Sequence, residues 1–200
     1  MFPPGWLNIP NSITLFRIAL VPVFVCFELT HQPEWALICF GIAAISDGVD
    51  GLLARLLNQR TKFGGVLDPV ADKVLIVAAL VSLVLEKRLP LWLLLITLFR
   101  DLLIFVGAIV VRRKNLEIPT EPSRIGKYAT ASMILLVVLT LVSAISAAPL
   151  ALRAYVAVVG FVAGLCVVIS TAQYFARYGY LWFAPARRLS PSETEKRVTA

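Results

Sequence analysis

Six long apolar stretches constrain the fold of this 200-residue chain more than any other feature. A helix needs about 20 mostly apolar residues to cross a bilayer, and such stretches occupy residues 12–30, 34–57, 64–86, 90–112, 126–147 and 150–177. Hydrophobic residues make up 59% of the chain and charged residues 16%, whereas a soluble domain is typically about 45–50% apolar and about 25% charged. The sequence therefore predicts an all-α polytopic membrane protein with six transmembrane helices, and it argues against a soluble enzyme.

The basic residues predict how these helices are oriented. Thirteen Lys and Arg lie near the second and fourth connections and after the last stretch, against three on the opposite side. Because Lys and Arg gather in cytoplasmic loops, both termini are expected in the cytoplasm, with the protein integral to the cytoplasmic (inner) membrane. We expect one membrane domain over residues 1–183 and a flexible basic C-terminal tail over 184–200. No stretch interleaves aromatic and basic residues, so nucleic acid is not an expected partner.

Four aspartates gather around the connection between the second and third stretches, where carboxylates are costly. Asp47 and Asp50 are three residues apart, and Asp68 and Asp72 are four apart, so each pair would share one helix face. Four ionised carboxylates would repel one another unless some hold protons or cations neutralise them. Hard oxygen ligands suit Mg²⁺ or Mn²⁺, and two such ions are suited to displacement at phosphorus. Because the nearby connection is basic and is expected in the cytoplasm, the cluster predicts a cation-binding site that faces the cytoplasm.

The same region carries a recognisable motif. The chain reads DGVDGLLAR from Asp47, then eight residues, then GGVLDPVAD ending at Asp72. This fits D-x-x-D-G-x-x-A-R-x8-G-x3-D-x3-D and resembles the signature of the CDP-alcohol phosphatidyltransferase family. The segments NIPNSITLFRIALVPVF, NQRTKFGGVLDPVADK and PSRIGKYAT are similar to phosphatidylglycerophosphate synthases and eukaryotic-type cardiolipin synthases within that family.

The resemblance implies that a phosphatidyl group moves from CDP-diacylglycerol to an alcohol and that CMP leaves. It implies two divalent cations, Mg²⁺ or Mn²⁺, held by Asp47, Asp50, Asp68 and Asp72. Asp72 would also be the catalytic base that takes the proton of the acceptor hydroxyl. The pocket for CDP-diacylglycerol would be lined by Asp50, Gly51, Ala54, Arg55 and Gly64. The resemblance further implies a homodimer.

The acceptor is predicted from a few basic residues. Arg100, Arg124 and Lys127 are candidates to bind an anionic glycerol compound, although Arg100 and its neighbour Asp101 could instead pair with other buried groups. Glycerol 3-phosphate is the first choice and phosphatidylglycerol, giving cardiolipin, the alternative. Arg17, within the first stretch, either snorkels to the headgroups or reaches the site from the side.

A cation-coupled secondary transporter is the alternative from another functional class, because transporters also keep carboxylates in the membrane. Such proteins usually carry inverted repeats around a midplane site. Here the acids cluster in one hairpin without a counterpart in the last three stretches, which favours the enzyme.

Overall fold

The computed structural model describes residues 9–56, 64–113, 124–145 and 149–178, which form six helices. Their bounds are α1 Ile9–Leu29, α2 Pro33–Leu56, α3 Gly64–Leu85, α4 Leu91–Arg113, α5 Arg124–Ile145 and α6 Leu150–Tyr178. Each helix begins and ends within three residues of a predicted stretch, so the all-α prediction is confirmed. The predicted tail, 184–200, lies outside the described residues.

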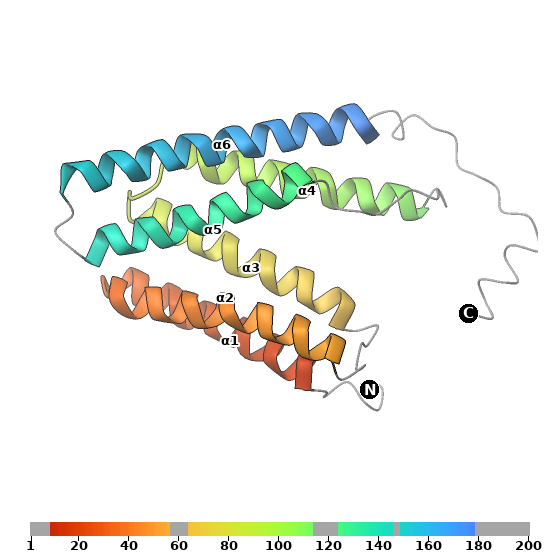
Figure 1. Ribbon diagram of the computed structural model, residues 1–200, viewed down its shortest axis with the longest axis horizontal. Coiled ribbons are helices and arrows are strands. Elements are labelled where there is room, and N and C mark those ends of the chain that lie inside the picture. Colours follow the sequence, from red (N-terminus) through yellow and green to blue (C-terminus); the bar gives the residue numbers. More distant parts are fainter. Residues whose placement is uncertain (1–8, 57–63, 114–123, 146–148, 179–200) are drawn as a thin grey trace, which may run out of the picture.

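The helices lie side by side along the long axis of the molecule, and successive helices run in opposite directions (Figure 1). One end, which we call the aspartate end, holds the beginnings of α1, α3 and α5 and the ends of α2, α4 and α6. The opposite end, the turn end, holds the short connections after α1 and α3. Helix α1 packs along both α2 and α3, while α6 packs against α4 and α5. Helix α2 also contacts α3 and α5, which joins the two halves of the bundle.

One stripe of α1 faces the interior of the bundle and includes charged residues. Thr14, Arg17, Val21, Phe24 and Glu28 are all buried, at alternating spacings of three and four residues. This spacing places them on one face of a helix. Ionisable groups in membrane helices almost always face the bundle interior. Helix α1 therefore carries a guanidinium inward near its middle, in the half toward the aspartate end, and a carboxylate inward near the turn end.

The turn end is tied together by two similar turns. His31 and Lys87 both adopt the left-handed backbone conformation, each with φ of 56°, and backbone amides in both turns cap the preceding helix in the Schellman pattern. Between the turns, His31 Nδ1 lies 3.0 Å from Glu86 Oε2, and Arg88 Nε lies 3.4 Å from the buried Glu28 Oε1. These contacts join the turn after α1 to the turn after α3.

Two glycines let α4 and α6 approach closely. A Cβ built on Gly164 would lie 2.6 Å from the Trp92 ring, and one on Gly107 would lie 1.7 Å from the Tyr174 hydroxyl oxygen. Small residues at such contacts are typical of helices that pack within a membrane.

Three of the described helices contain windows that are long and apolar enough to cross a membrane, over Ser12–Leu29, Ile125–Ile145 and Leu150–Ala176. Helix α2 adds a shorter apolar stretch, Pro33–Ser46, that ends just before Asp47. The protein is thus a membrane protein by the length and composition of its helices.

Candidate active site

The candidate site is built around Asp72, in the third turn from the beginning of α3. Its Oδ1 accepts a hydrogen bond of 2.5 Å from Arg17 Nη1 on α1. The Arg17 side chain is 0% exposed, whereas 40% of the Asp72 side chain remains exposed. Because Arg17 lies on the buried stripe of α1, its guanidinium reaches α3 and does not snorkel to the surface. Of the two alternatives for Arg17, the structure supports contact with the site.

A second ion pair, made by the next residue, lies on another face of α3. Lys73 Nζ donates a hydrogen bond of 2.5 Å to Asp101 Oδ1 on α4. Arg100 Nη1 lies 3.4 Å from the same oxygen, and its Nη2 donates to the backbone carbonyl of Gly126 on α5 at 3.2 Å. This network joins α3, α4 and α5. Arg100 and Asp101 therefore pair with each other and with groups of α5 and α3, although Lys73, the partner of Asp101 on α3, has 46% of its side chain exposed.

The other predicted ligands and pocket residues occupy the expected helices. Asp47, Asp50, Gly51, Ala54 and Arg55 all fall in α2, whereas Gly64 begins α3 and Asp68 follows one turn later. The side chains of residues 47–69 lie outside the described part of the chain, so the predicted metal and CDP contacts of these residues stay predictions. Among the side chains that are described, no three His, Cys, Asp or Glu gather as a metal site would require.

Of the predicted acceptor-binding residues, Arg124 and Lys127 lie at the beginning of α5, and Arg100 lies near the middle of α4. Arg100 is buried, with 6% of its surface exposed, and its Nε is enclosed without a hydrogen-bond partner in the described part of the structure. Arg124 begins α5, with its side chain outside the described residues, and Lys127 is exposed one turn further. The three residues thus come from two helices that Arg100 itself joins through Gly126.

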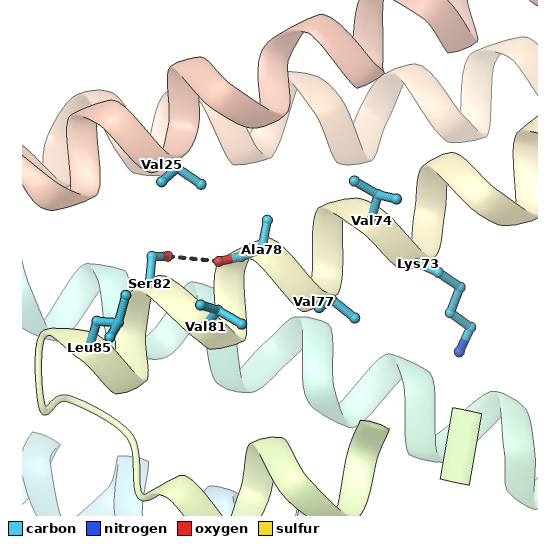
Figure 2. Close-up of a pocket in the computed structure, with 8 residues that line it drawn as sticks. All are labelled: Val25, Lys73, Val74, Val77, Ala78, Val81, Ser82 and Leu85. Carbon is cyan, nitrogen blue, oxygen red and sulfur yellow. Dashed lines mark hydrogen bonds between the residues drawn. The ribbon is translucent and has the colours of Figure 1, made fainter. Parts of the chain in front are cut away.

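An apolar groove of about 430 Å³ runs along α3, starting one residue beyond Asp72. Figure 2 shows Lys73 at one end of the groove and Leu85 near the other, with Val25 of α1 across from them. The Ser82 hydroxyl donates to the Ala78 carbonyl, so it offers little polarity to the groove. The surface is suited to a hydrocarbon chain.

Comparison with known proteins agrees with the geometry. The model of the CDP-alcohol phosphatidyltransferase family matches residues 7–173. The chain belongs to this family. The match spans all six helices up to the last turns of α6 and includes Arg17 as well as the four aspartates. Members of the family generally depend on divalent cations. Membership favours the enzyme over the transporter alternative.

Individual relatives point to two related reactions. The chain is 37% identical over 133 residues, 64% of its length, to a cardiolipin synthase (CMP-forming) of Streptomyces coelicolor. It is 51% identical over 77 residues, 37% of its length, to CDP-diacylglycerol–glycerol-3-phosphate 3-phosphatidyltransferase of Escherichia coli K12, and a Shigella boydii protein of that name matches equally. The aligned regions cover 61% and 42% of the Streptomyces and Escherichia proteins, so the chain spans less than two thirds of the relatives it matches.

Proposed function

We propose that this protein is a membrane phosphatidyltransferase of phospholipid synthesis. It transfers the phosphatidyl group of CDP-diacylglycerol to glycerol 3-phosphate, giving phosphatidylglycerophosphate and CMP. The observation that carries the proposal is the placement of Asp72, the last acid of the family motif. Its carboxylate is anchored by a buried arginine and yet remains 40% exposed, as a group that must meet a substrate requires.

The chemistry assigned to Asp72 is proton transfer. Its carboxylate accepts the proton of the acceptor hydroxyl while that oxygen attacks the phosphorus that carries diacylglycerol. The bond from this phosphorus to the CMP oxygen breaks, and CMP leaves with the electron pair. A positioned base of this kind typically accelerates a reaction by about 10²–10⁴-fold.

The donor set fits divalent cations. Four carboxylates within 26 residues supply the hard oxygen ligands that Mg²⁺ and Mn²⁺ prefer, and the anchored carboxylate of Asp72 is the member of this set whose side chain is described. Asp47, Asp50, Asp68 and Asp72 would hold two ions, which would neutralise the pyrophosphate of the donor. Asp50, Gly51, Ala54, Arg55 and Gly64 would bind the CDP portion.

The apolar groove on α3 is assigned to one acyl chain of the donor. Lys73 and Leu85 are twelve residues apart, which corresponds to about 18 Å along a helix. The groove begins at Lys73, the residue that follows Asp72 in the chain, and extends along α3 to Leu85 (Figure 2). A lipid whose headgroup reacts at Asp72 could therefore lay a hydrocarbon chain along α3.

Phosphatidylglycerol is the second candidate acceptor, which would make the product cardiolipin. The segment RDLLIFVGAIVVRR in α4 is somewhat more similar to the cardiolipin-forming enzymes, and the longest of the reported alignments is to a cardiolipin synthase. Arg124 and Lys127 are the better acceptor contacts, because the Arg100 guanidinium already binds Asp101 and Gly126.

For the membrane topology, we assign one span to each of the six helices. We place the protein in the inner membrane, with the aspartate end facing the cytoplasm.

A homodimer is supported by α4, where exposed apolar residues recur at alternating intervals of four and three: Leu91, Leu95, Leu98, Leu102, Phe105 and Ile109. This is the spacing of a seam between two helices. Light scattering of the purified protein in detergent should give twice the mass of one chain, and a monomer would contradict the proposal.

The decisive experiment supplies CDP-diacylglycerol with glycerol 3-phosphate or phosphatidylglycerol as the sole acceptor, in the presence of Mg²⁺ or Mn²⁺. CMP release is measured, and the lipid product is identified by mass spectrometry. We expect phosphatidylglycerophosphate, and we expect EDTA to stop the reaction. Activity that survives EDTA would contradict the metal proposal, and absence of CMP release with either acceptor would contradict the function.

A further inference from the structure

We propose that Arg17 of α1 is a positioning residue that fixes the carboxylate of Asp72 in its working orientation. The inference rests on the proposed function, because it assigns to Arg17 an effect on metal binding and on turnover at Asp72. Arg17 itself need not touch either substrate. It acts through the hydrogen bond of 2.5 Å between its Nη1 and Asp72 Oδ1.

Burial of Arg17 favours this contact. The Arg17 side chain is fully buried, and arginine keeps its charge in proteins. A buried charge is costly unless an opposite charge accompanies it, and the Asp72 carboxylate supplies such a charge to Arg17. The guanidinium cannot leave for water without unpacking α1 from α3. The carboxylate it holds is therefore restrained on one side and accessible on the other.

The next residue of α3 strengthens the restraint. Lys73 pairs with Asp101 of α4 at 2.5 Å. Two adjacent residues of α3, one acidic and one basic, thus form ion pairs with two different helices. Consecutive side chains on a helix differ in direction by about 100°. Two such contacts fix the rotation of α3 about its own axis, and this rotation decides where the Asp72 carboxylate points.

A restraint of this kind has a measurable consequence at a metal-binding or proton-accepting carboxylate. Partners that orient the ligands of a metal typically contribute about 10–100-fold to metal affinity or activity. A planar guanidinium also fixes a carboxylate in a way that a lysine ammonium does not. Removal of the charge of Arg17, and replacement of its planar guanidinium by an ammonium group, should therefore each change metal affinity and turnover measurably.

The test compares Arg17→Met and Arg17→Lys with the unaltered protein in detergent. Mn²⁺ binding is measured without substrates by electron paramagnetic resonance, and kcat is measured from CMP release. We expect Arg17→Met to weaken Mn²⁺ binding and to lower kcat, each by about 10–100-fold, with Arg17→Lys between it and the unaltered protein. Mn²⁺ affinity and kcat within twofold of the unaltered protein in Arg17→Met would overturn the proposal. If that variant does not fold, the same result in Arg17→Lys overturns it.

Glu28→Gln is the matched control, because Glu28 lies on the same buried stripe of α1 and also belongs to a buried ion pair. We expect it to lower the unfolding temperature while Mn²⁺ affinity and kcat stay within twofold. Equal losses of Mn²⁺ affinity and kcat in Glu28→Gln and Arg17→Met would show a general packing effect and would overturn the proposal. Failure of the proposed function is distinct, since the unaltered protein would then release no CMP.

Discussion

The ion pair between Glu28 and Arg88 allows a sharp prediction about stability. Glu28 is fully buried, and neither of its carboxylate oxygens has a hydrogen-bond partner within the described structure. Its charge is offset by Arg88 Nε at 3.4 Å, while 21% of the Arg88 side chain is exposed. Removing one member of a buried pair typically costs about 3–5 kcal/mol, because the other charge remains buried and uncompensated. We therefore expect Arg88→Met to lower the free energy of unfolding by about that amount.

The double variant tests the reasoning behind this magnitude. Replacing a buried ion pair by apolar residues is often neutral or stabilising, by up to about 4 kcal/mol. Glu28→Leu combined with Arg88→Met should thus be at least as stable as the unaltered protein, although each member of the pair is gone. Arg153→Met, a change at an exposed position of α6, is the control and should stay within about 0.5 kcal/mol.

The assay is unfolding in mixed micelles with increasing SDS, followed by circular dichroism. A cost below about 1 kcal/mol for Arg88→Met would refute the argument, since that is the range of exposed salt bridges. It would mean that Glu28 does not bear an uncompensated charge when Arg88 is absent. A double variant as unstable as Arg88→Met would instead show that packing by the arginine stem, and not charge, holds the two turns together.

Three further predictions concern single residues. Asp72→Asn should lower kcat by at least about 10²-fold and leave CDP binding, measured by calorimetry, largely intact; lost binding would make its role mainly structural. Gly107→Ala should destabilise the protein by about 1–3 kcal/mol, because the new Cβ would lie 1.7 Å from the Tyr174 hydroxyl oxygen. Gly41→Ala is the control: a Cβ at this position would have no neighbouring atom within 4 Å, so this variant should be neutral or stabilising in the same unfolding assay. Lys87→Gly should stabilise by about 0.5–1 kcal/mol, because the left-handed conformation with φ of 56° costs an L-residue about 1–2 kcal/mol and glycine about 0.5–1 in chain entropy; a lower unfolding midpoint would contradict this.

The helices themselves could be predicted from the sequence because bilayer thickness fixes their length and polar connections separate them. Helix α1 begins three residues earlier than expected, at Ile9, since Pro10 and Asn11 continue the first turn, where proline is tolerated. The acids of the motif fell on α2 and α3 as predicted, because their positions along the chain decide which helix carries them.

The partners of the charged side chains could not be predicted. Arg17 and Asp72 are 55 residues apart, and Lys73 and Asp101 are 28 apart. Hydropathy gives the depth of a residue in the membrane, but it does not say which neighbouring helix its side chain faces. The spacing of Arg17 from Thr14 and Val21 could have placed it on one face of α1, but the packing of α1 against α3 is needed to show that it meets Asp72.

The pairing of α1 with α3 has a consequence for biogenesis. When α1 first enters the bilayer, Arg17 has no Asp72 to meet, because the ribosome must still add 55 residues. At about 5–20 residues per second this takes roughly 3–11 s. During that interval an arginine near the centre of a span costs about 2.5–3.5 kcal/mol. The ion pair that offsets this cost can therefore form only after the third span has been synthesised, so the first span completes its packing late in biogenesis.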